Sequence, residues 1–202
     1  MSTERERSWR GVIFASRGAL LAIPAAALVV AGRPTRRSVA AGVPLALAGE
    51  ALRCWAVGYS GVTTRDARVT APQLVTAGPY AHVRNPLYLA NALTALGFTV
   101  AYTGAQSFAE RAGFFALGLG TMFGVYAAIV PLEEAFLAAT FGEAFADYVA
   151  AVPRLVPRRD AYPRGEGAYD PRAILRAESR TFVTFGAMLA ALAAKALDAP
   201  DA

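Results

Sequence analysis

Polar side chains that could do chemistry gather in a few short segments of an otherwise apolar chain. The first segment, residues 72–88, is dense in turn residues and contains the only histidine, His82, together with Arg84. Pro86 suits the first turn of a following helix, and a helix start offers unpaired N–H groups to an anion. Arg84 adds a guanidinium that can hold a carboxylate through two parallel hydrogen bonds. This segment therefore predicts a site for a carboxylate group, or alternatively an anchor at the membrane surface, where Tyr and Arg are common.

The second segment is the acidic pair Glu133–Glu134, which closely follows Pro131. Neighbouring residues of a helix point about 100° apart, so one carboxylate of the pair faces any given ligand. Two interpretations stay open. Acids in a first turn after a proline stabilise the start of a helix, or the pair belongs to a binding site. His82, as a lone histidine, is likewise either an interfacial polar residue or a general base.

A third polar pair lies inside an apolar run. Glu50 and Arg53 are three residues apart, and this spacing puts both on one face of a helix. They form either a structural ion pair that offsets the cost of burying charge, or the polar lining of a site with Trp55 and Tyr59 nearby. One histidine and one cysteine, Cys54, argue against zinc chemistry, so no metal site is predicted.

The elements that must position these residues are long apolar helices. Apolar residues make up 55% of the 202-residue chain and charged residues only 17%, with a mean hydropathy of +0.37, whereas a soluble domain has about 25% charged residues. A span needs roughly 17 to 20 apolar residues, and five runs are candidates: residues 11–32, 39–59, 87–103, 113–130 and the weaker 182–197. The sequence therefore predicts an all-α fold, a polytopic transmembrane helix bundle of about four to five spans. A soluble helical bundle is the alternative.

The polar stretches near the end of the chain suggest how it is organised. Residues 136–156 carry apolar and charged side chains at helical spacing, which predicts an amphipathic helix on the membrane surface. Residues 158–170 are rich in Arg, Gly, Pro and Asp, a composition typical of a mobile connection. We therefore expect a compact core, residues 1–157, and a C-terminal extension, residues 158–202, that can hold one further apolar helix.

The placement of arginine predicts the orientation in the membrane. If the N-terminus is cytoplasmic, thirteen arginines flank the spans on that side, in residues 1–10, 60–86 and 154–180, and four lie opposite, in residues 33–38 and at Arg111. Cytoplasmic loops carry the excess of Arg and Lys, so the N-terminus and both long polar segments are expected in the cytoplasm. The net charge of +5 then fits an anionic membrane surface rather than nucleic acid.

Glycines in the fourth apolar run need a separate explanation. Gly118, Gly120 and Gly124 have the spacing GxGxxxG and lie within residues 113–130, with no strand before them. This context does not fit a dinucleotide-binding loop. Gly120 and Gly124 are instead expected to permit close packing between helices.

Two motifs in order give the chain a resemblance to a known family. The first is Leu74-Val75-Thr76-Ala77-Gly78-Pro79-Tyr80 followed by Arg84-Asn85-Pro86-Leu87-Tyr88, and the second is Glu133-Glu134 followed by Tyr148 and Val152-Pro153-Arg154. Over about residues 45–157 the chain resembles integral membrane methyltransferases of the isoprenylcysteine carboxyl methyltransferase family. It shares the Arg-Asn-Pro-x-Tyr element with phospholipid N-methyltransferases. The resemblance implies a polytopic enzyme that uses S-adenosyl-L-methionine in cytoplasmic cofactor-binding loops and takes a lipophilic substrate from the bilayer.

The resemblance also implies roles for particular residues. The implied cofactor-binding residues are Leu74, Val75, Tyr80, Asn85, Pro86, Tyr88 and Glu134. The expected catalytic residues are Arg84, Glu133 and His82, and the expected substrate contacts are Arg53 and Trp55. Glu134 would bind the amino group of the cofactor, and Arg84 or the helix start would bind its carboxylate.

The favoured reaction is methyl transfer to the carboxyl group of an isoprenylcysteine-like acceptor. A carboxylate needs no base, whereas an amine acceptor would need one, and Glu133 and His82 are the candidates. Two alternatives stay open: a phospholipid or amine N-methyltransferase, and a non-enzymatic membrane transporter or assembly protein with Glu50, Arg53 and Arg17 along its pathway. The expected partners are a lipophilic or lipid-modified substrate and membrane lipids, with no nucleic acid and no metal.

Overall fold

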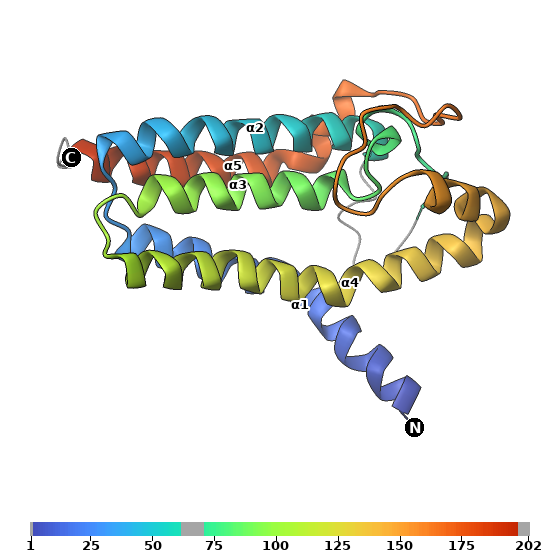
Figure 1. Ribbon diagram of the computed structural model, residues 1–202, viewed down its shortest axis with the longest axis horizontal. Helices are drawn as coiled ribbons and strands as arrows, with labels where there is room; N and C mark the ends of the chain where they lie inside the picture. The colour runs from blue at the N-terminus through green and yellow to red at the C-terminus, as the bar shows by residue number, and fades with distance from the viewer. Residues whose placement is uncertain (1, 62–70, 198–202) are drawn as a thin grey trace. The chain divides into compact units, whose positions relative to one another are not determined.

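The computed structural model describes residues 2–61 and 71–197. Its helices are α1 (Ser2–Ala31), α2 (Arg36–Ser60), the short 3-10 helix η2 (Gly78–Ala81), α3 (Pro86–Tyr102), α4 (Phe108–Ala151) and α5 (Pro171–Leu197) (Figure 1). None of the described residues lies in a β-strand, so the predicted all-α fold is confirmed. Arg65 and Arg68, which enter the orientation prediction, lie outside the described residues, as do residues 198–202 of the predicted extension.

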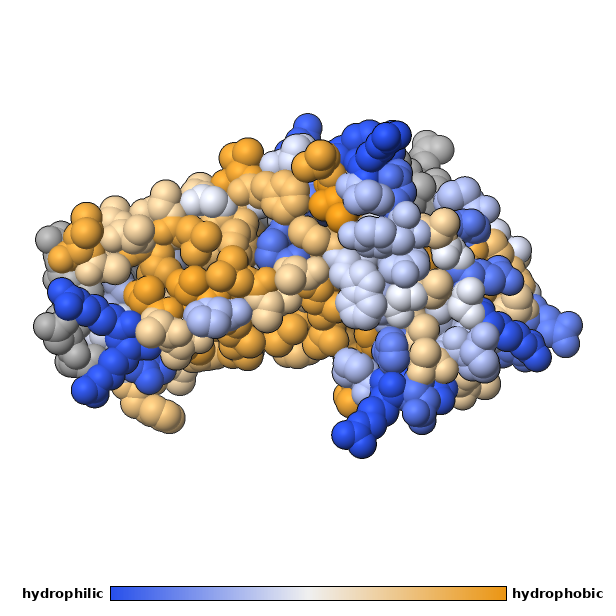
Figure 2. Space-filling view, turned by 90° about the horizontal axis from the view of Figure 1, so that it is seen from above, coloured by the Kyte–Doolittle hydropathy of each residue, from blue (hydrophilic) through white to orange (hydrophobic). Residues whose placement is uncertain are grey.

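Several helices have the length and composition of membrane spans. Helices α2, α4 and α5 are long and apolar enough to cross a membrane, and Ala15–Ala31 within α1 is a shorter apolar helix. Helix α3 has 17 residues, which reach about 26 Å at 1.5 Å per residue, close to the lower limit for a span. Figure 2 shows hydrophobic side chains over much of the visible surface of the long helices. The predicted polytopic helix bundle is therefore confirmed, and the chain is an integral membrane protein.

The chain forms two compact units that interleave in sequence. The first unit takes its described residues from 1–49, 92–129 and 181–202, and the second unit takes its own from 50–91 and 130–180. Helices α2, α3, α4 and α5 each contribute residues to both units.

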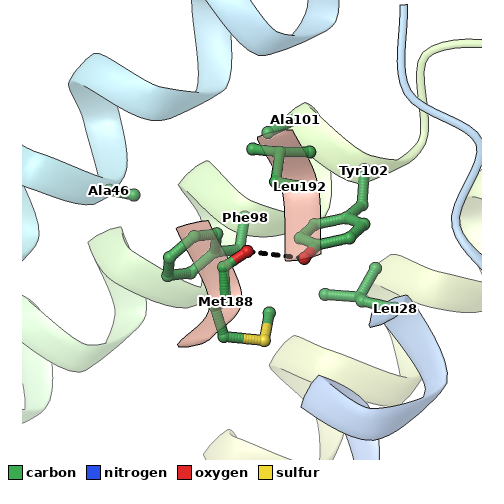
Figure 3. Close-up of a cluster of buried hydrophobic side chains, with 7 residues drawn as sticks. All are labelled: Leu28, Ala46, Phe98, Ala101, Tyr102, Met188 and Leu192. Atoms are coloured by element: carbon green, nitrogen blue, oxygen red, sulfur yellow. Dashed lines mark hydrogen bonds between the residues drawn. The ribbon is translucent and has the colours of Figure 1, made fainter. Parts of the chain in front are cut away.

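An apolar core joins four helices in the first unit. Its buried members are Leu28, Ala46, Phe98, Ala101, Tyr102, Met188 and Leu192 (Figure 3). The Tyr102 hydroxyl donates to the Met188 carbonyl at 2.7 Å, which satisfies the polar group that a buried tyrosine carries into an apolar core. The core thus ties α1, α2 and α3 to α5.

Two glycines let α2 and α3 approach closely in the first unit. A Cβ on Gly42 would lie 2.4 Å from the carbonyl oxygen of Gly97, and one on Gly97 would lie 2.3 Å from the amide nitrogen of Ala46. Gly120 and Gly124 have open space at the same position. The prediction that this second pair packs helices together is therefore wrong for the described residues. Helical spacing identifies glycines on one face but does not say which face meets a neighbour.

The short hairpins of the first unit meet at one end. Thr35 and Ser38 exchange backbone-to-hydroxyl hydrogen bonds at 2.9 and 3.1 Å, a reciprocal cap that fixes the start of α2. The Ala105 amide donates to the Arg33 carbonyl at 2.8 Å, and the Arg33 side chain pairs with Glu110 at 2.7 Å. The loops before α2 and before α4 therefore lie side by side.

In the second unit, α4 is interrupted at Gly142, whose φ of 51° and ψ of −120° are not helical. Glycine adopts a positive φ at least cost. Beyond this break the buried side chains are Phe145, Tyr148 and Val152, and they pack against partners that include Leu74 and Tyr162. The apolar face of the predicted amphipathic segment thus covers a loop of its own chain.

Residues 158–170, here called the strap, are held by hydrogen bonds to the rest of the second unit. The backbone amides of Arg158, Tyr162 and Asp170 donate to the carbonyls of His82, Ala81 and Gly58, each at 2.8 to 2.9 Å. The strap leads directly into α5. The prediction of a mobile connection is wrong, because composition reports turn residues and low apolar content but not the distant backbone groups that pair with them.

Candidate functional site

A glycine turn and a tyrosine shape the loop before α3. Gly78 has a φ of +60°, and a Cβ there would lie 2.3 Å from the Tyr59 ring, so this position favours glycine for both its backbone and its space. The Tyr148 hydroxyl, on the last part of α4, donates to the Tyr80 carbonyl at 2.7 Å. The two motif segments that are far apart in sequence therefore lie against each other.

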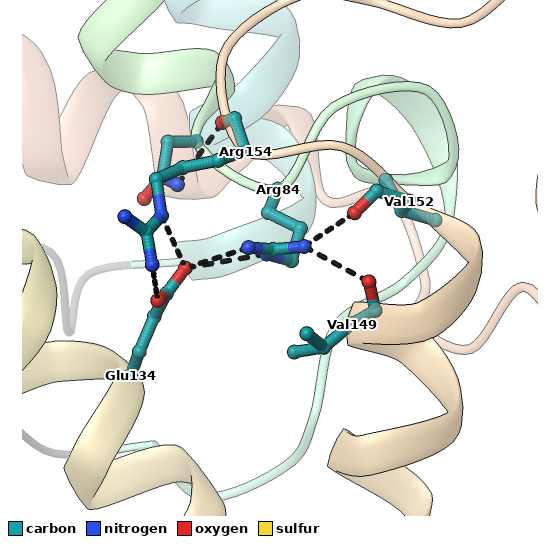
Figure 4. Close-up of polar contacts among 6 residues, drawn as sticks. Arg84, Glu134, Val149, Val152 and Arg154 are labelled. Atoms are coloured by element: carbon teal, nitrogen blue, oxygen red, sulfur yellow. Dashed lines mark hydrogen bonds and ion pairs between the residues drawn. The ribbon is translucent and has the colours of Figure 1, made fainter.

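Arg84 contacts a carboxylate and the backbone at once (Figure 4). Its Nε and Nη2 donate to Oε1 of Glu134 at 3.2 and 3.1 Å. Its Nη1 donates to the carbonyls of Val152 at 2.6 Å and Val149 at 3.1 Å. The side chain is 10% exposed, and its planar fork of donors suits this arrangement. Arg84 therefore links the loop before α3 to Glu134 in the middle of α4 and to the backbone at the C-terminal end of that helix.

A second arginine shares the same carboxylate. Arg154 donates from Nε to Oε1 of Glu134 at 3.1 Å and from Nη2 to Oε2. The side-chain amide of Asn85 donates to the Arg154 carbonyl at 3.1 Å. The Arg154 side chain is half exposed, whereas that of Glu134 is 18% exposed. Two guanidinium groups on one carboxylate leave one positive charge in this cluster, which can attract an anionic group.

The neighbouring acid has a different partner. The Tyr88 hydroxyl donates to Oε2 of Glu133 at 2.6 Å, while Glu134 contacts the two arginines. This separation agrees with the 100° offset between adjacent helical residues. Tyr88 lies in the first turn of α3, so the acidic pair connects α4 both to this helix and to the loop before it.

Tyr80 and His82 occupy defined polar positions in the loop. Burial raises the pKa of the Tyr80 phenol to about 12, and the negative charge of Glu133 adds to the increase, so the phenol is neutral at physiological pH. Nδ1 of His82 lies 3.1 Å from the Arg158 carbonyl. Because a carbonyl only accepts, this hydrogen bond requires a proton on Nδ1. In the neutral ring, Nε2 is then the nitrogen that can accept a proton.

The two predicted substrate residues diverge on α2. Arg53 donates from Nε and Nη2 to Glu178 of α5 at 2.8 and 3.0 Å, and from Nη1 to Asn91 of α3 at 2.7 Å. The Glu178 side chain is completely buried. Trp55 is 44% exposed, because positions two apart point about 200° from each other. The structure therefore brings Arg53 to a carboxylate of its own chain and does not bring Trp55 to it.

The remaining predicted cofactor residues lie on the same loop and on the first turn of α3. Leu74 packs against the cluster of Phe145, Tyr148 and Val152. Val75 lies beside Gly167 of the strap, and Pro86 is a buried first residue of α3. Every residue that the sequence marks as a site residue belongs to the second unit. Their roles toward a ligand stay predictions.

Sequence reasoning misses several partners that complete this unit. Arg154 stands in the quoted motif Val152-Pro153-Arg154, and its place there is a signal that could have paired it with Glu134. Glu178 is an acid within the arginine-rich residues 172–180, and this contrast could have marked it as a partner for a buried arginine. The backbone groups of the strap carry no such signal.

These observations define a class of protein: a polytopic helical membrane protein whose charged site joins the loop before α3 to an acidic turn of α4. Among residues 2–61 and 71–197, no group of three or more His, Cys, Asp or Glu side chains is placed to hold a metal ion. A sequence profile described as phospholipid methyltransferase matches residues 38–144. The chain belongs to the phospholipid methyltransferase family.

A curated relative matches about half of the chain. Over 96 residues the chain is 38% identical to the cobalt-zinc-cadmium resistance protein CzcN of Cupriavidus metallidurans. The alignment covers 48% of this chain and 40% of that relative, so the chain matches about two fifths of the length of the relative. No solved structure matches the chain.

Proposed function

We propose that the protein is a membrane methyltransferase that uses S-adenosyl-L-methionine and methylates a lipophilic acceptor. Membership of the phospholipid methyltransferase family supports the reaction class. The observation that carries the proposal is the arrangement around Glu134. This carboxylate comes from one motif, and Arg84 comes from the other, 50 residues away in sequence. Such convergence is expected of a binding site assembled from separated motifs.

The charged groups of the site fit the amino acid part of this cofactor. An α-ammonium group suits Glu134, and an α-carboxylate suits the guanidinium of Arg84 or of the half-exposed Arg154. Tyr88 and Glu133 supply a further polar pair beside them. Bound S-adenosyl-L-methionine would supply a sulfonium methyl group that is open to nucleophilic attack. The residues of the chain would bind and orient the cofactor and the acceptor, and would keep water away from them.

The acceptor group is either a carboxylate or an amine. The resemblance to isoprenylcysteine enzymes favours a carboxylate, with Arg53 as its cation. However, Arg53 already donates to Glu178 and Asn91, and a substrate carboxylate would have to compete with Glu178. This occupancy and the family match favour an amine on a lipid. An amine must lose a proton, and Glu133 and Nε2 of His82 are the groups that could take it.

The site is proposed to face the cytoplasm, with the N-terminus on the same side. The arginine distribution supports this orientation. It can be tested in a Cys54→Ser background by adding one cysteine at exposed Asp160 of the strap or at exposed Ala105 between α3 and α4. A membrane-impermeant thiol reagent should label Asp160→Cys in inside-out vesicles and Ala105→Cys in right-side-out vesicles. The reverse pattern would refute the orientation.

Cofactor binding is the direct test of the reaction class. Calorimetry of the detergent-purified protein with S-adenosylhomocysteine should show saturable binding. A double variant, Glu134→Ala with Tyr88→Ala, should lose it. A matched control is Glu110→Ala, which removes an exposed acid of the first unit and should bind normally. Absent binding by the wild type, or full binding by the double variant, would contradict the proposal.

Product analysis identifies the acceptor and separates the enzyme from a transporter. Membranes that contain the protein are incubated with S-adenosyl-L-methionine carrying a radiolabelled methyl group, and label is measured in the organic extract. Base-labile label would indicate a methyl ester, and base-stable label would indicate a methylated amine. A transporter or assembly protein would leave the organic phase unlabelled.

A further inference from the structure

We propose that the strap, residues 158–170, is part of the cofactor site and acts by fixing the backbone of residues 74–77. The inference rests on the proposed function, because it assigns a role toward the same cofactor. The strap lies beyond residues 38–144, the region that matches the family. Neither this match nor the resemblance over about residues 45–157 assigns the strap a role, and Thr76 would be the positioning residue.

The central contact is a buried threonine that joins the loop to the strap. The Thr76 hydroxyl donates to the Arg164 carbonyl at 2.9 Å and accepts from the Glu166 amide at 2.8 Å. The backbone amides of Thr76 and Ala77 both donate to the Glu166 carbonyl, at 2.9 and 3.0 Å. Thr76 is 3% exposed, so water does not replace these contacts. Four hydrogen bonds thus hold the loop at the residue next to Val75.

Each end of the strap is anchored by a tyrosine. Near the start, the Tyr162 amide donates to Ala81, and its ring lies 5.6 Å from that of Tyr148. Near the end, the Tyr169 ring packs against that of Tyr59 in a tilted arrangement, with 5.4 Å between the ring centres. A Cβ on Gly58 would lie 2.2 Å from the Tyr169 ring, so this packing uses the absence of a side chain on α2. Because both ends are held, the strap does not drift away from the loop.

A glycine of the strap matches the side chain of Val75. Gly167 has a φ of +121°, and a Cβ there would lie 3.2 Å from Cγ1 of Val75. A residue with a side chain would be strained at this φ and would push on Val75. Leu74 and Val75 are the residues for which the family resemblance implies cofactor contacts. The strap therefore sets both the backbone and one side chain of that segment.

The test removes the threonine contacts without changing the size of the side chain. Thr76→Val leaves the Glu166 amide and the Arg164 carbonyl without their partner, whereas Thr76→Ser keeps both hydrogen bonds. Thr99→Val is the matched control, because it removes a similarly buried hydroxyl in the first unit, which donates to Ala95. Each variant is measured by calorimetry with S-adenosylhomocysteine, by thermal unfolding and by hydrogen exchange at the Thr76 and Ala77 amides.

The expected result separates positioning from general stability. Thr76→Val should weaken S-adenosylhomocysteine binding by about tenfold or more, since two buried groups lose their partner, and should speed exchange at both amides. Thr76→Ser should bind S-adenosylhomocysteine and exchange its amides as the wild type does. Thr99→Val should lower the melting temperature with unchanged affinity. Gly167→Ala serves as a second, milder variant if Thr76→Val does not fold, and it should also weaken binding.

Two failures can be told apart. If the wild type does not bind S-adenosylhomocysteine, the proposed function fails and the role of the strap fails with it. If the wild type binds and Thr76→Val or Gly167→Ala binds equally well, the strap is not part of the site and the proposed function stands. Unchanged exchange at the Thr76 amide in Thr76→Val would also overturn the inference.

Discussion

The two compact units of this protein share four helices but are stabilised by different interactions. In the first unit, α2 and α3 meet where Gly42 and Gly97 bring backbone against backbone, and an apolar core joins them to α1 and α5. In the second unit, Arg53, Arg84 and Arg154 connect helices and loops through carboxylates and carbonyl groups. The packing of one helix can thus depend on side-chain shape in the first unit and on paired charges in the second.

The comparison explains where each kind of residue is needed. Apolar helices in a bilayer gain little from hiding apolar surface from lipid, so their association depends on close packing. Side-chain volume is therefore the sensitive property of the first unit. The second unit buries charged groups, and a buried charge that loses its partner is costly. Charge is therefore its sensitive property, and matched substitutions in the two units can test this difference.

The largest expected effect is the loss of charge at Glu178. Glu178→Gln keeps the size of the side chain but removes the buried carboxylate to which the Arg53 guanidinium donates. We expect a loss of about 3 to 5 kcal/mol in the free energy of unfolding, measured by thermal or denaturant unfolding in detergent. Asp170→Asn is the control, because its pair with Arg176 is exposed and should contribute less than about 1 kcal/mol. Equal losses in the two variants would contradict the role of burial.

A somewhat smaller effect is expected at Glu134, which is partly exposed. Glu134→Gln leaves Arg84 and Arg154 facing each other without the shared carboxylate, and should cost about 2 to 3 kcal/mol. Glu110→Gln makes the same change in the first unit, where both partners of the pair with Arg33 are about half exposed. That control should lower the free energy of unfolding much less, because water screens an exposed pair. If the first unit proved as sensitive to charge as the second, the comparison would fail.

Added volume should distinguish two glycines of the first unit according to the space around them. Gly97→Ala places a methyl group within 2.3 Å of the backbone of α2 and should destabilise the protein by about 1 to 3 kcal/mol. Gly120→Ala, also in the first unit, adds a methyl group into open space and should be neutral or slightly stabilising in a helix. The measurement is the melting temperature of each variant. Similar shifts for both would show that helix propensity, not close approach, decides the outcome.

The smallest effect at neutral pH concerns the Tyr80 phenol. In the unfolded chain this group ionises near 10, and burial raises its pKa to about 12 in the folded protein. Its contribution to stability is therefore complete below pH 10 and is lost as the pH rises toward 12. As the pH is raised from 10 toward 12, the free energy of unfolding should fall more steeply for the wild type than for Tyr80→Phe. Parallel curves would show that the phenol is not buried in the folded state.

Much of this architecture follows from the sequence, because a bilayer imposes strong rules. A span needs a minimum apolar length, and this rule places α2 and α3 close to the predicted runs. Helix α4 instead continues through Pro131, past the predicted end at residue 130, to Ala151. The site loop and the acidic pair follow from residue types at the ends of spans. The separate partners of Glu133 and Glu134 also follow, since adjacent helical residues diverge.

Other features depend on partners that no local pattern reveals. Arg53 lies on α2, but no local pattern predicts its contact with Glu178, 125 residues away, at 2.8 Å. The strap has the composition of a mobile segment, but backbone groups of distant residues hold it. Gly120 and Gly124 have a packing spacing, whereas Gly42 and Gly97 make the contact. In each case the outcome depends on which surfaces the fold brings together.

The end of α4 links the site to the cooperativity of the fold. The last carbonyls of a helix have no partner within it, and at this end Arg84 takes the Val149 carbonyl and Arg158 takes the Ala151 carbonyl at 2.7 Å. These arginines come from the motif loop and from the strap. The last turn can therefore fray only if the hydrogen bonds from these two guanidinium groups break. Local unfolding of this helix end and disruption of the charged cluster are then a single cooperative event. The open population at this helix end is then also the population that lacks an assembled site.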